Sequence, residues 1–187
     1  MIKVADELPE AARQAVVQSY PLDLPDFSEQ LDSLAALAAQ ICDAPIGLIS
    51  VVEADRQRFI GRSGTDLSET PRDISFCAHA MHQSDCMIVP DATTDQRFAD
   101  NPLVTSGPEI RFYAGHPLVS REGAPLGSFC IIDTVPREAL TDTQRRGLET
   151  LSYAAMALLE RSRVEQSSAL SKKQTKSEID DLVQRFN

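Results

Sequence analysis

Apolar residues recur at helical spacing in two parts of the chain. The first stripe consists of Leu31, Leu34, Leu37, Ala38 and Ile41. Asp26 and Glu29, just before it, have the spacing of a capping box, and Pro45 ends the pattern. Further along, Thr141 and Gln144 have the same capping spacing. They precede a second stripe, formed by Leu148, Leu151, Ala155, Leu158 and Leu159. The pattern therefore predicts two amphipathic helices, each with one apolar face.

Between the two helices the apolar pattern changes to a period of two. In residues 46–52, Ile46, Leu48, Ser50 and Val52 fall on one side of an extended segment, and β-branched residues dominate. The turn sequence "EADRQ" leads into a second strand, "RQRFIGR". Further extended patterns occur at 86–90, 110–120 and 124–134, the last two joined through "REG". We count five strands.

Two other segments belong to neither pattern. A short helix is expected in "FCAHAMHQ", with Asp73 or Ser75 as its N-cap. Residues 91–109 form a long connection rich in Asp, Thr, Pro and Asn, and a connection of that length is usually functional or mobile. Hairpins require antiparallel pairing, so we expect an α+β sandwich with the two long helices over one sheet face. The short helix and the long connection would cover the other face and leave a ligand cavity there.

Composition narrows the class of protein. The net charge of −10 argues against a nucleic-acid partner. No apolar stretch is long enough to cross a bilayer, so no membrane partner is expected. The four cysteines form no CxxC pair, which favours free thiols in a reducing compartment. These features predict a cytoplasmic protein.

Five blocks of sequence resemble the GAF domain family, in particular the GAF sensor modules found ahead of bacterial histidine kinases and diguanylate cyclases. The blocks are "APIGLISVVEADRQRFIGRSG", "ETPRDISFCAHAM", "IVPDATTDQRFADNPLV", "IRFYAGHPL" and "PLGSFCIIDT". The resemblance implies a six-stranded antiparallel sheet between helices, a pocket over one sheet face, and a parallel homodimer through the terminal helices. A sixth strand must then come from a segment interpreted as loop. The resulting organisation is an N-terminal arm at 1–25, a GAF domain at 26–160, and a helical extension or linker at 161–187.

A sensor of this kind would bind a small molecule, and ten residues are candidates for the binding site. They are the aromatic residues Phe76, Phe98, Phe112, Tyr113 and Phe129, and the polar residues Cys77, His79, Asp91, Arg111 and His116. The aromatic residues fall in the blocks expected to surround one cavity. Arg111 either binds an anionic ligand or pairs with a loop aspartate and fixes the loop. His116 stands where related modules often have alanine, and could add a pH-sensitive group near the pocket rim.

Other readings of these residues remain open. Cys77, His79, His82 and Cys86 would bind zinc only if all four converged, and haem on His79 or His116 has little support. The tetrapyrrole-binding motifs of phytochrome-like GAF domains are not recognisable. Cys77 also stands near a catalytic cysteine of free methionine sulfoxide reductases, but the following loop lacks the second cysteine. We therefore expect a non-enzymatic sensor without an assigned metal or cofactor; a reductase or a ligand-free dimerisation module are the alternatives.

Overall fold

A computed structural model describes residues 8–23 and 25–185; of residues 25, 26, 177 and 179–185 it describes only the backbone. Six strands form one antiparallel sheet in the order β3-β2-β1-β6-β5-β4. The strands are β1 (Ile46–Val52), β2 (Arg56–Ser63), β3 (Glu69–Pro71), β4 (Met87–Val89), β5 (Phe112–Val119) and β6 (Pro125–Asp133). The α+β fold expected from the sequence is confirmed. The sixth strand is β3, only three residues long and too short to show a period of two.

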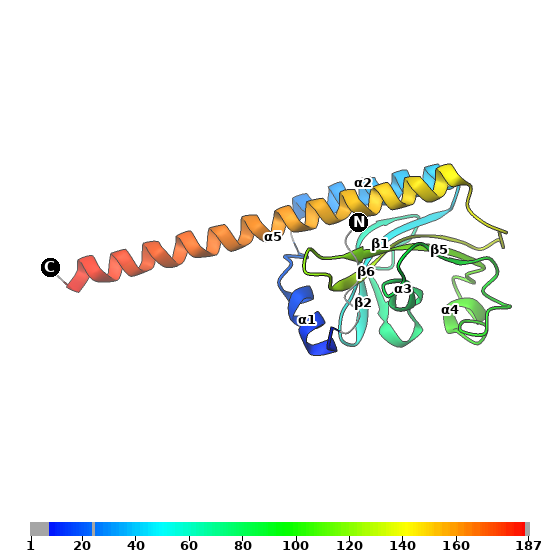
Figure 1. Cartoon of the computed structure of the whole chain (residues 1–187), viewed down its shortest axis with the longest axis horizontal. Coiled ribbons are helices and arrows are strands. Elements are labelled where there is room, and N and C mark those ends of the chain that lie inside the picture. Colours follow the sequence, from blue (N-terminus) through cyan, green and yellow to red (C-terminus); the bar gives the residue numbers. More distant parts are fainter. Residues whose placement is uncertain (1–7, 24, 186–187) are drawn as a thin grey trace.

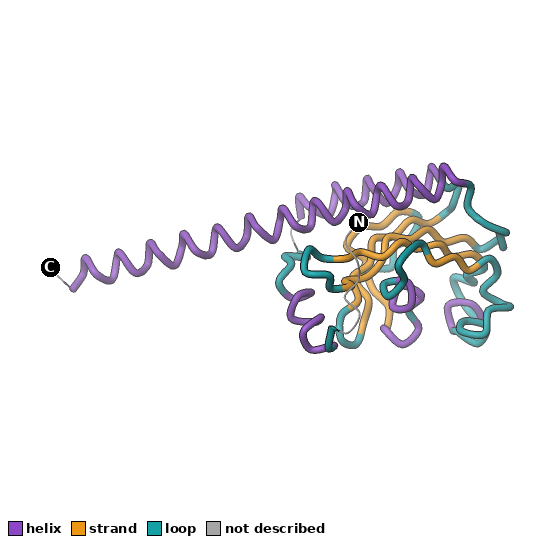
Figure 2. The backbone as a smooth tube through the Cα atoms, in the orientation of Figure 1, coloured by secondary structure: helices purple, strands orange, loops and turns teal. Residues whose placement is uncertain are grey.

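Helices lie on both sides of the sheet (Figures 1 and 2). They are α1 (Glu10–Gln18), α2 (Pro25–Ile41), α3 (Phe76–Ala80), α4 (Pro102–Thr105) and α5 (Asp142–Arg185), with a 3-10 turn at Arg72–Ile74 before α3. The helices α2 and α5 run side by side over one face, whereas α3 and α4 lie on the other (Figure 1). We call these the helix face and the loop face. No helix in the described part of the chain is long and apolar enough to cross a membrane.

Side-chain caps define where two helices begin. The backbone N–H of Thr141 donates to Gln144 Oε1 (3.0 Å), and the N–H of Gln144 donates to Thr141 Oγ1 (3.3 Å), which is the predicted capping box of α5. Of the two candidate caps of α3, Ser75 is the one used, because its Oγ accepts the N–H of Ala78 (3.0 Å). The side chain of Asp26, the cap predicted for α2, lies outside the described residues.

The alternation in the strands divides the core into two layers. The helix-face layer contains large buried side chains of α2, β5, β6 and α5, among them Leu31, Phe112, Leu118, Phe129 and Leu148. The loop-face layer lies between the sheet and α3, and includes Leu48, Phe76, Met81, Phe98 and Tyr113. Gly47 lets α2 pack directly onto β1, because a Cβ there would overlap the carbonyl oxygen of Ala35.

The last helix extends far beyond the sheet (Figure 1). It has 44 residues, and at 1.5 Å per residue this corresponds to about 66 Å. Residues 161–185 continue the helix without a break, so the polar segment after Glu165 does not end it. From Val164 to Lys176 every side chain is exposed. This part of α5 therefore makes no packing contact with its own domain.

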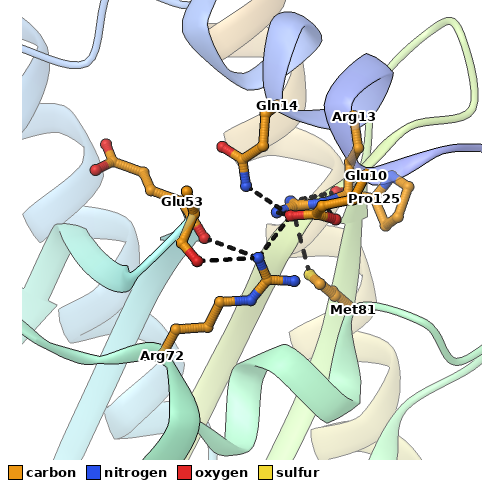
Figure 3. A network of polar contacts seen from close by, with 8 residues as sticks. Glu10, Arg13, Gln14, Glu53, Arg72, Met81 and Pro125 are labelled. Carbon is orange, nitrogen blue, oxygen red and sulfur yellow. Dashed lines mark hydrogen bonds and ion pairs between the residues drawn. The ribbon is translucent and has the colours of Figure 1, made fainter.

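The N-terminal helix α1 is fixed to one edge of the domain through Arg13 (Figure 3). Arg13 is 1% exposed; its guanidinium donates to both carboxylate oxygens of Glu10 (2.8 Å each) and to the carbonyl oxygen of Pro125 (3.1 Å). Arg72, in the turn before α3, also pairs with Glu10 (2.5 Å). These two arginines hold the pKa of the Glu10 carboxyl well below its usual range, since both favour its charged form.

Candidate functional site

A small cavity of about 40 Å³ lies on the loop face. It is enclosed by the sheet, by α3 and by the segment around α4, with β3 at the sheet edge contributing to the wall. Most of its wall is apolar and includes Leu48, Phe59, Leu67, Phe76, Leu103 and Ile110. Its polar lining groups come from Gln57, Thr65, Thr70, Cys77 and Tyr113. None of the lining residues is charged. In this conformation the volume suffices for water but not for a metabolite, so a ligand must displace part of the wall.

A chain of hydrogen bonds holds one side of the cavity together. Ser75 Oγ donates to Gln57 Oε1 (2.5 Å), and Gln57 Nε2 donates to Thr70 Oγ1 (2.6 Å). The chain joins the N-cap of α3 to β2 and β3, and all three residues are buried. Because these polar groups bind one another, they offer few free partners to a ligand. The sequence analysis missed Gln57 and Thr70. For Gln57, the period-two pattern of β2 could have revealed its place, because it puts Gln57 on the same side of the strand as Phe59.

Three predicted residues form an aromatic stack beside the cavity. The rings of Phe76 and Phe98 lie 3.9 Å apart between centroids at an interplanar angle of 12°, and Tyr113 lies 5.3 Å from Phe76. His79 meets the edge of Phe98 at 5.0 Å. The stack fixes the connection 91–109 to α3, and Phe98 is only 1% exposed. The connection is therefore a packed part of the domain that contains α4, rather than an open loop.

Behind the cavity wall, thiols and hydroxyls form a buried cluster. The sulfur atoms of Cys77 and Cys130 are 3.7 Å apart. The hydroxyl of Tyr113 lies 3.5 Å from Cys77 Sγ and 2.9 Å from Ser128 Oγ. Gly115 makes room for this arrangement, because a Cβ there would overlap the phenol group of Tyr113. Burial and the neighbouring thiols raise the pKa of Tyr113 well above its usual value.

Three other predicted residues lie on the opposite face of the sheet. Phe112 and Phe129 belong to the helix-face core, so the expectation that the five aromatic residues surround one cavity is wrong for these two. His116 is also on that face: its Nδ1 lies 2.8 Å from Ser152 Oγ of α5. It is not at the pocket rim, because it stands three positions after Tyr113 and successive strand residues alternate between faces. Burial lowers the pKa of His116.

Arg111 and Asp91 lie at the edge of the sheet near β4 and β5. The guanidinium of Arg111 donates to the carbonyl oxygens of Val104 (3.0 Å) and Ile110 (3.1 Å), so it ties the backbone of α4 to the residues just before β5. Asp91 accepts the N–H and the hydroxyl of Thr93 (3.0 and 2.7 Å) in a turn. Ile110 lies in the loop-face core together with Tyr113, contrary to the expected alternation. The reason is that β5 begins only at Phe112.

The histidines and cysteines of residues 77–86 do not converge. Cys77 faces Cys130, and the sulfur of Cys86 lies 3.8 Å from the carbonyl oxygen of Met87. Among the side chains that the structure describes, no three from His, Cys, Asp or Glu are grouped as metal ligands.

Comparison with known proteins decides the family. The model of the GAF domain matches residues 26–159. The chain belongs to the GAF domain family. A solved GAF domain of an Acinetobacter phosphoenolpyruvate-protein phosphotransferase shares the fold, with a TM-score of 0.60 and 11% identity over 86% of this chain and 99% of that one.

A curated relative is much closer in sequence. It is a cyclic di-GMP phosphodiesterase of Pseudomonas aeruginosa, 42% identical over 148 residues, which are 79% of this chain and 25% of that protein. This chain thus matches about a quarter of the length of the relative. The free methionine-R-sulfoxide reductase of Neisseria meningitidis has the same fold, with a TM-score of 0.59 and 16% identity over 88% of this chain and 99% of that one.

These relatives correct one expectation. The sequence analysis classified the chain as not an enzyme, yet the curated relative is named as a phosphodiesterase and the Neisseria protein as a reductase. A protein with a segment of similar sequence and a protein of similar fold are therefore both named as enzymes, and this finding overturns the non-enzymatic classification.

Proposed function

We propose that this GAF domain is a sensor that binds a small, uncharged, largely apolar molecule in the loop-face cavity. The proposal places it in a protein that acts on cyclic di-GMP, as the name of the Pseudomonas relative indicates for that protein. The observation that supports this proposal is the cavity lining, which is mostly apolar and contains no charged side chain. An anionic ligand such as a nucleotide would have no cation to bind there. A cytoplasmic location fits this role, since all four cysteines are free thiols.

The signal is proposed to travel through the strands that separate the cavity from α5. Tyr113 lines the cavity from β5, and His116 of the same strand contacts Ser152 of α5 on the other face. A ligand that displaces the cavity wall would shift β5 and with it the start of α5. Further along, Glu160 of α5 accepts a hydrogen bond from the hydroxyl of Tyr20 (2.6 Å), which ties the helix to the N-terminal arm. The free part of α5 begins just beyond this contact.

A homodimer through the terminal helices is part of the proposal. Tyr153, Ala157 and Val164 are exposed on α5, and their spacings of four and seven residues put them on one face. Leu37 is exposed on the neighbouring helix α2 (43%). Paired helices would carry the movement toward an output domain, which would be a phosphodiesterase, a kinase or a cyclase. Light scattering of the wild type and of Val164→Glu tests this, because a charge in a paired stripe should shift the protein toward the monomer.

The binding test uses two probes that have the same ring and differ in charge. Benzyl alcohol is neutral and benzoate is anionic, and their binding is followed by the backbone amide signals of the protein. We expect benzyl alcohol to shift amides around Leu48, Cys77 and Tyr113, and benzoate to leave them unchanged. Shifts from benzoate alone, or from neither probe, would refute the proposed ligand class. Leu103→Trp should block binding by filling the cavity, whereas Leu158→Trp, at a half-buried position on α5, should not.

A reductase for free methionine sulfoxide is the second candidate. It is favoured by the position of Cys77, which lines the cavity from α3. The connection 91–109 contains no cysteine, so a second thiol would have to come from elsewhere. Turnover of free methionine sulfoxide with thioredoxin, lost in Cys77→Ser, would establish this activity; the absence of turnover in the wild type would exclude it.

A further inference from the structure

Two cysteines that are far apart in the sequence meet in the loop-face core. Cys77 lies in α3 and Cys130 in β6, 53 positions later, and their sulfur atoms are 3.7 Å apart. Both side chains are buried, at 2% and 0% exposure. The separation is too long for a disulfide, whose sulfur atoms lie about 2 Å apart, but side-chain rotation could close most of the difference.

The cavity gives a small reagent a route to this pair. Cys77 lines the cavity wall, whereas Cys130 does not line it but has its sulfur 3.7 Å from that of Cys77. The free volume of about 40 Å³ is enough for a molecule of the size of water or hydrogen peroxide. Neither Cys42 nor Cys86 lines the cavity. Only one of the four thiols is thus reached through it.

The surroundings of Cys77 also favour its thiolate. Cys130 is the main hydrogen-bond partner that lowers the pKa of the Cys77 thiol, with further contributions from the hydroxyls of Ser128, Ser50 and Tyr113; burial opposes this. The pKa of Cys130 is raised in turn, by the hydrogen bond with Cys77 and by burial. Because Cys77 is also the thiol of the pair that lines the cavity, it is the one suited to attack.

The two other cysteines lack such an environment. Burial raises the pKa of Cys42 to about 11 and that of Cys86 to about 12. Neither has another cysteine as a hydrogen-bond partner, and Cys42 serves as the internal control for the reactivity of Cys77.

We propose that Cys77 and Cys130 are an oxidisable dithiol that a peroxide converts into a disulfide. In the first step the sulfur of Cys77 attacks one peroxide oxygen, the O–O bond breaks, and the second oxygen leaves as hydroxide, which takes up a proton to become water. Cys77 is then a sulfenic acid. In the second step the sulfur of Cys130 attacks the sulfur of Cys77, the S–O bond breaks, and the hydroxyl leaves with the proton of Cys130 as a second water. Two thiols lose two electrons and the peroxide gains them.

The cross-link would change the part of the domain that carries the cavity. It ties α3 to β6, and α3 also carries Phe76, whose ring stacks on Phe98 of the connection 91–109. Formation of the bond removes the thiol that Tyr113 contacts and draws one cavity wall toward the sheet. The dithiol does not require the proposed sensor function, and its test measures covalent chemistry alone.

The experiment maps disulfides in the folded protein after treatment with hydrogen peroxide. A Cys86→Ser background is needed because trypsin leaves Cys77 and Cys86 in one peptide, residues 73–97, while Cys130 lies in the peptide 122–137. After quenching, alkylation under denaturing conditions and digestion without reductant, we expect a cross-linked pair of these two peptides. Dithiothreitol should separate the pair. Cys42 should stay a free thiol and be recovered in its alkylated form. Its oxidation should be at least about tenfold slower than that of Cys77, since each unit of pKa changes the thiolate fraction tenfold.

Two variants trap the intermediate and test the order of the steps. In Cys130→Ser the sulfenic acid of Cys77 should accumulate and react with a cyclic 1,3-diketone, whereas Cys77→Ser should leave Cys130 a thiol. Circular dichroism checks that each variant is folded, and the mapping in the Cys86→Ser background does not depend on either of them. The proposal is wrong if both cysteines stay alkylatable under peroxide, or if Cys77 proceeds to a sulfinic acid while Cys130 remains a free thiol.

Discussion

The two faces of the sheet are built from the same strands but differ in what covers them. On the helix face, two long helices pack against the sheet, and Gly47 lets α2 pack directly onto β1. On the loop face, the cover consists of the five residues of α3 and the connection that contains α4. The cavity, the hydrogen-bond chain through Gln57 and the pair of thiols all lie on this second face.

The difference shows how one sheet can serve two purposes. A long helix presents a continuous apolar stripe, so we expect its face of the sheet to be filled more completely and to provide most of the stability. Short elements cannot cover a sheet as evenly, and polar groups must satisfy one another in the gaps that remain. The helix face holds α5, and the less regular loop face holds the candidate site.

The largest expected effect comes from one matched pair of phenylalanines. Phe129→Ala should lower the free energy of unfolding by about 3 to 5 kcal/mol, because it leaves a cavity in the filled helix-face core. Phe59→Ala, at a half-buried position beside the existing cavity, should cost less than about 2 kcal/mol. Urea unfolding of both variants measures the difference. Equal losses would show that the two faces contribute alike.

The attachment of α1 to the domain should be weakened by removing the guanidinium of Arg13. In Arg13→Met the free energy of unfolding should fall by about 1.5 to 3 kcal/mol, because hydrogen bonds to the buried charge are lost and the carbonyl oxygen of Pro125 loses this donor. Arg72→Met removes the more exposed partner of Glu10 and should cost less than about 1 kcal/mol. Urea unfolding with hydrogen exchange of the α1 amides would measure both. A larger loss in Arg72→Met would contradict the role assigned to Arg13.

A third change tests whether the loop-face cluster depends on Gly115. Gly115→Ala should push the Tyr113 hydroxyl away from Cys77 and Ser128 at a cost of about 1 to 2 kcal/mol. Thermal unfolding measures the cost, and peroxide treatment of the same variant should show slower formation of the Cys77–Cys130 disulfide. Unchanged stability together with an unchanged oxidation rate would mean that Tyr113 does not support the cluster.

The smallest expected effect is the pH dependence contributed by His116. Its pKa in the folded protein is lowered by burial, so the unfolded chain, with an ordinary histidine pKa of about 6.5, binds the proton more readily. Stability should therefore fall as the pH drops below about 6.5, by less than about 1 kcal/mol once solvent screening is allowed for. The groups that face this ring are Ser152, Tyr153 and the carboxylates of Glu149 and Asp85.

Unfolding of His116→Gln between pH 5 and 8 checks this contribution. The difference in stability between the wild type and the variant should shrink toward acidic pH. A difference that stays constant or grows toward acidic pH would mean that the folded state accepts the proton on His116.

Much of the fold could be read from local patterns, because these depend on residues close in the chain. The capping box of Thr141 and Gln144 was found from its spacing and is present. The strand β3 was missed because three residues carry no periodicity. The position of His116 on the helix face could have been predicted from its distance to Tyr113 along the strand, but the family motif suggested a pocket rim instead.

The candidate site was harder to predict, since it depends on contacts between distant segments. Three of the ten candidate residues, Phe76, Cys77 and Tyr113, line the cavity. Leu67 and Leu103, which also line it, come from segments whose sequence shows no pattern pointing to a pocket. The ligand-binding roles of the ten candidate residues remain predictions.

The sequence by itself determined the family, the two helical stripes and the alternation that assigns each strand residue to one of two faces, because these are properties of short segments and their chemistry. Only the tertiary structure decided how the strands align with one another and with α3. That alignment brings Cys77 to within 3.7 Å of Cys130 and leaves a cavity beside them. No local pattern encodes such a meeting, because it results from the packing of the whole sheet.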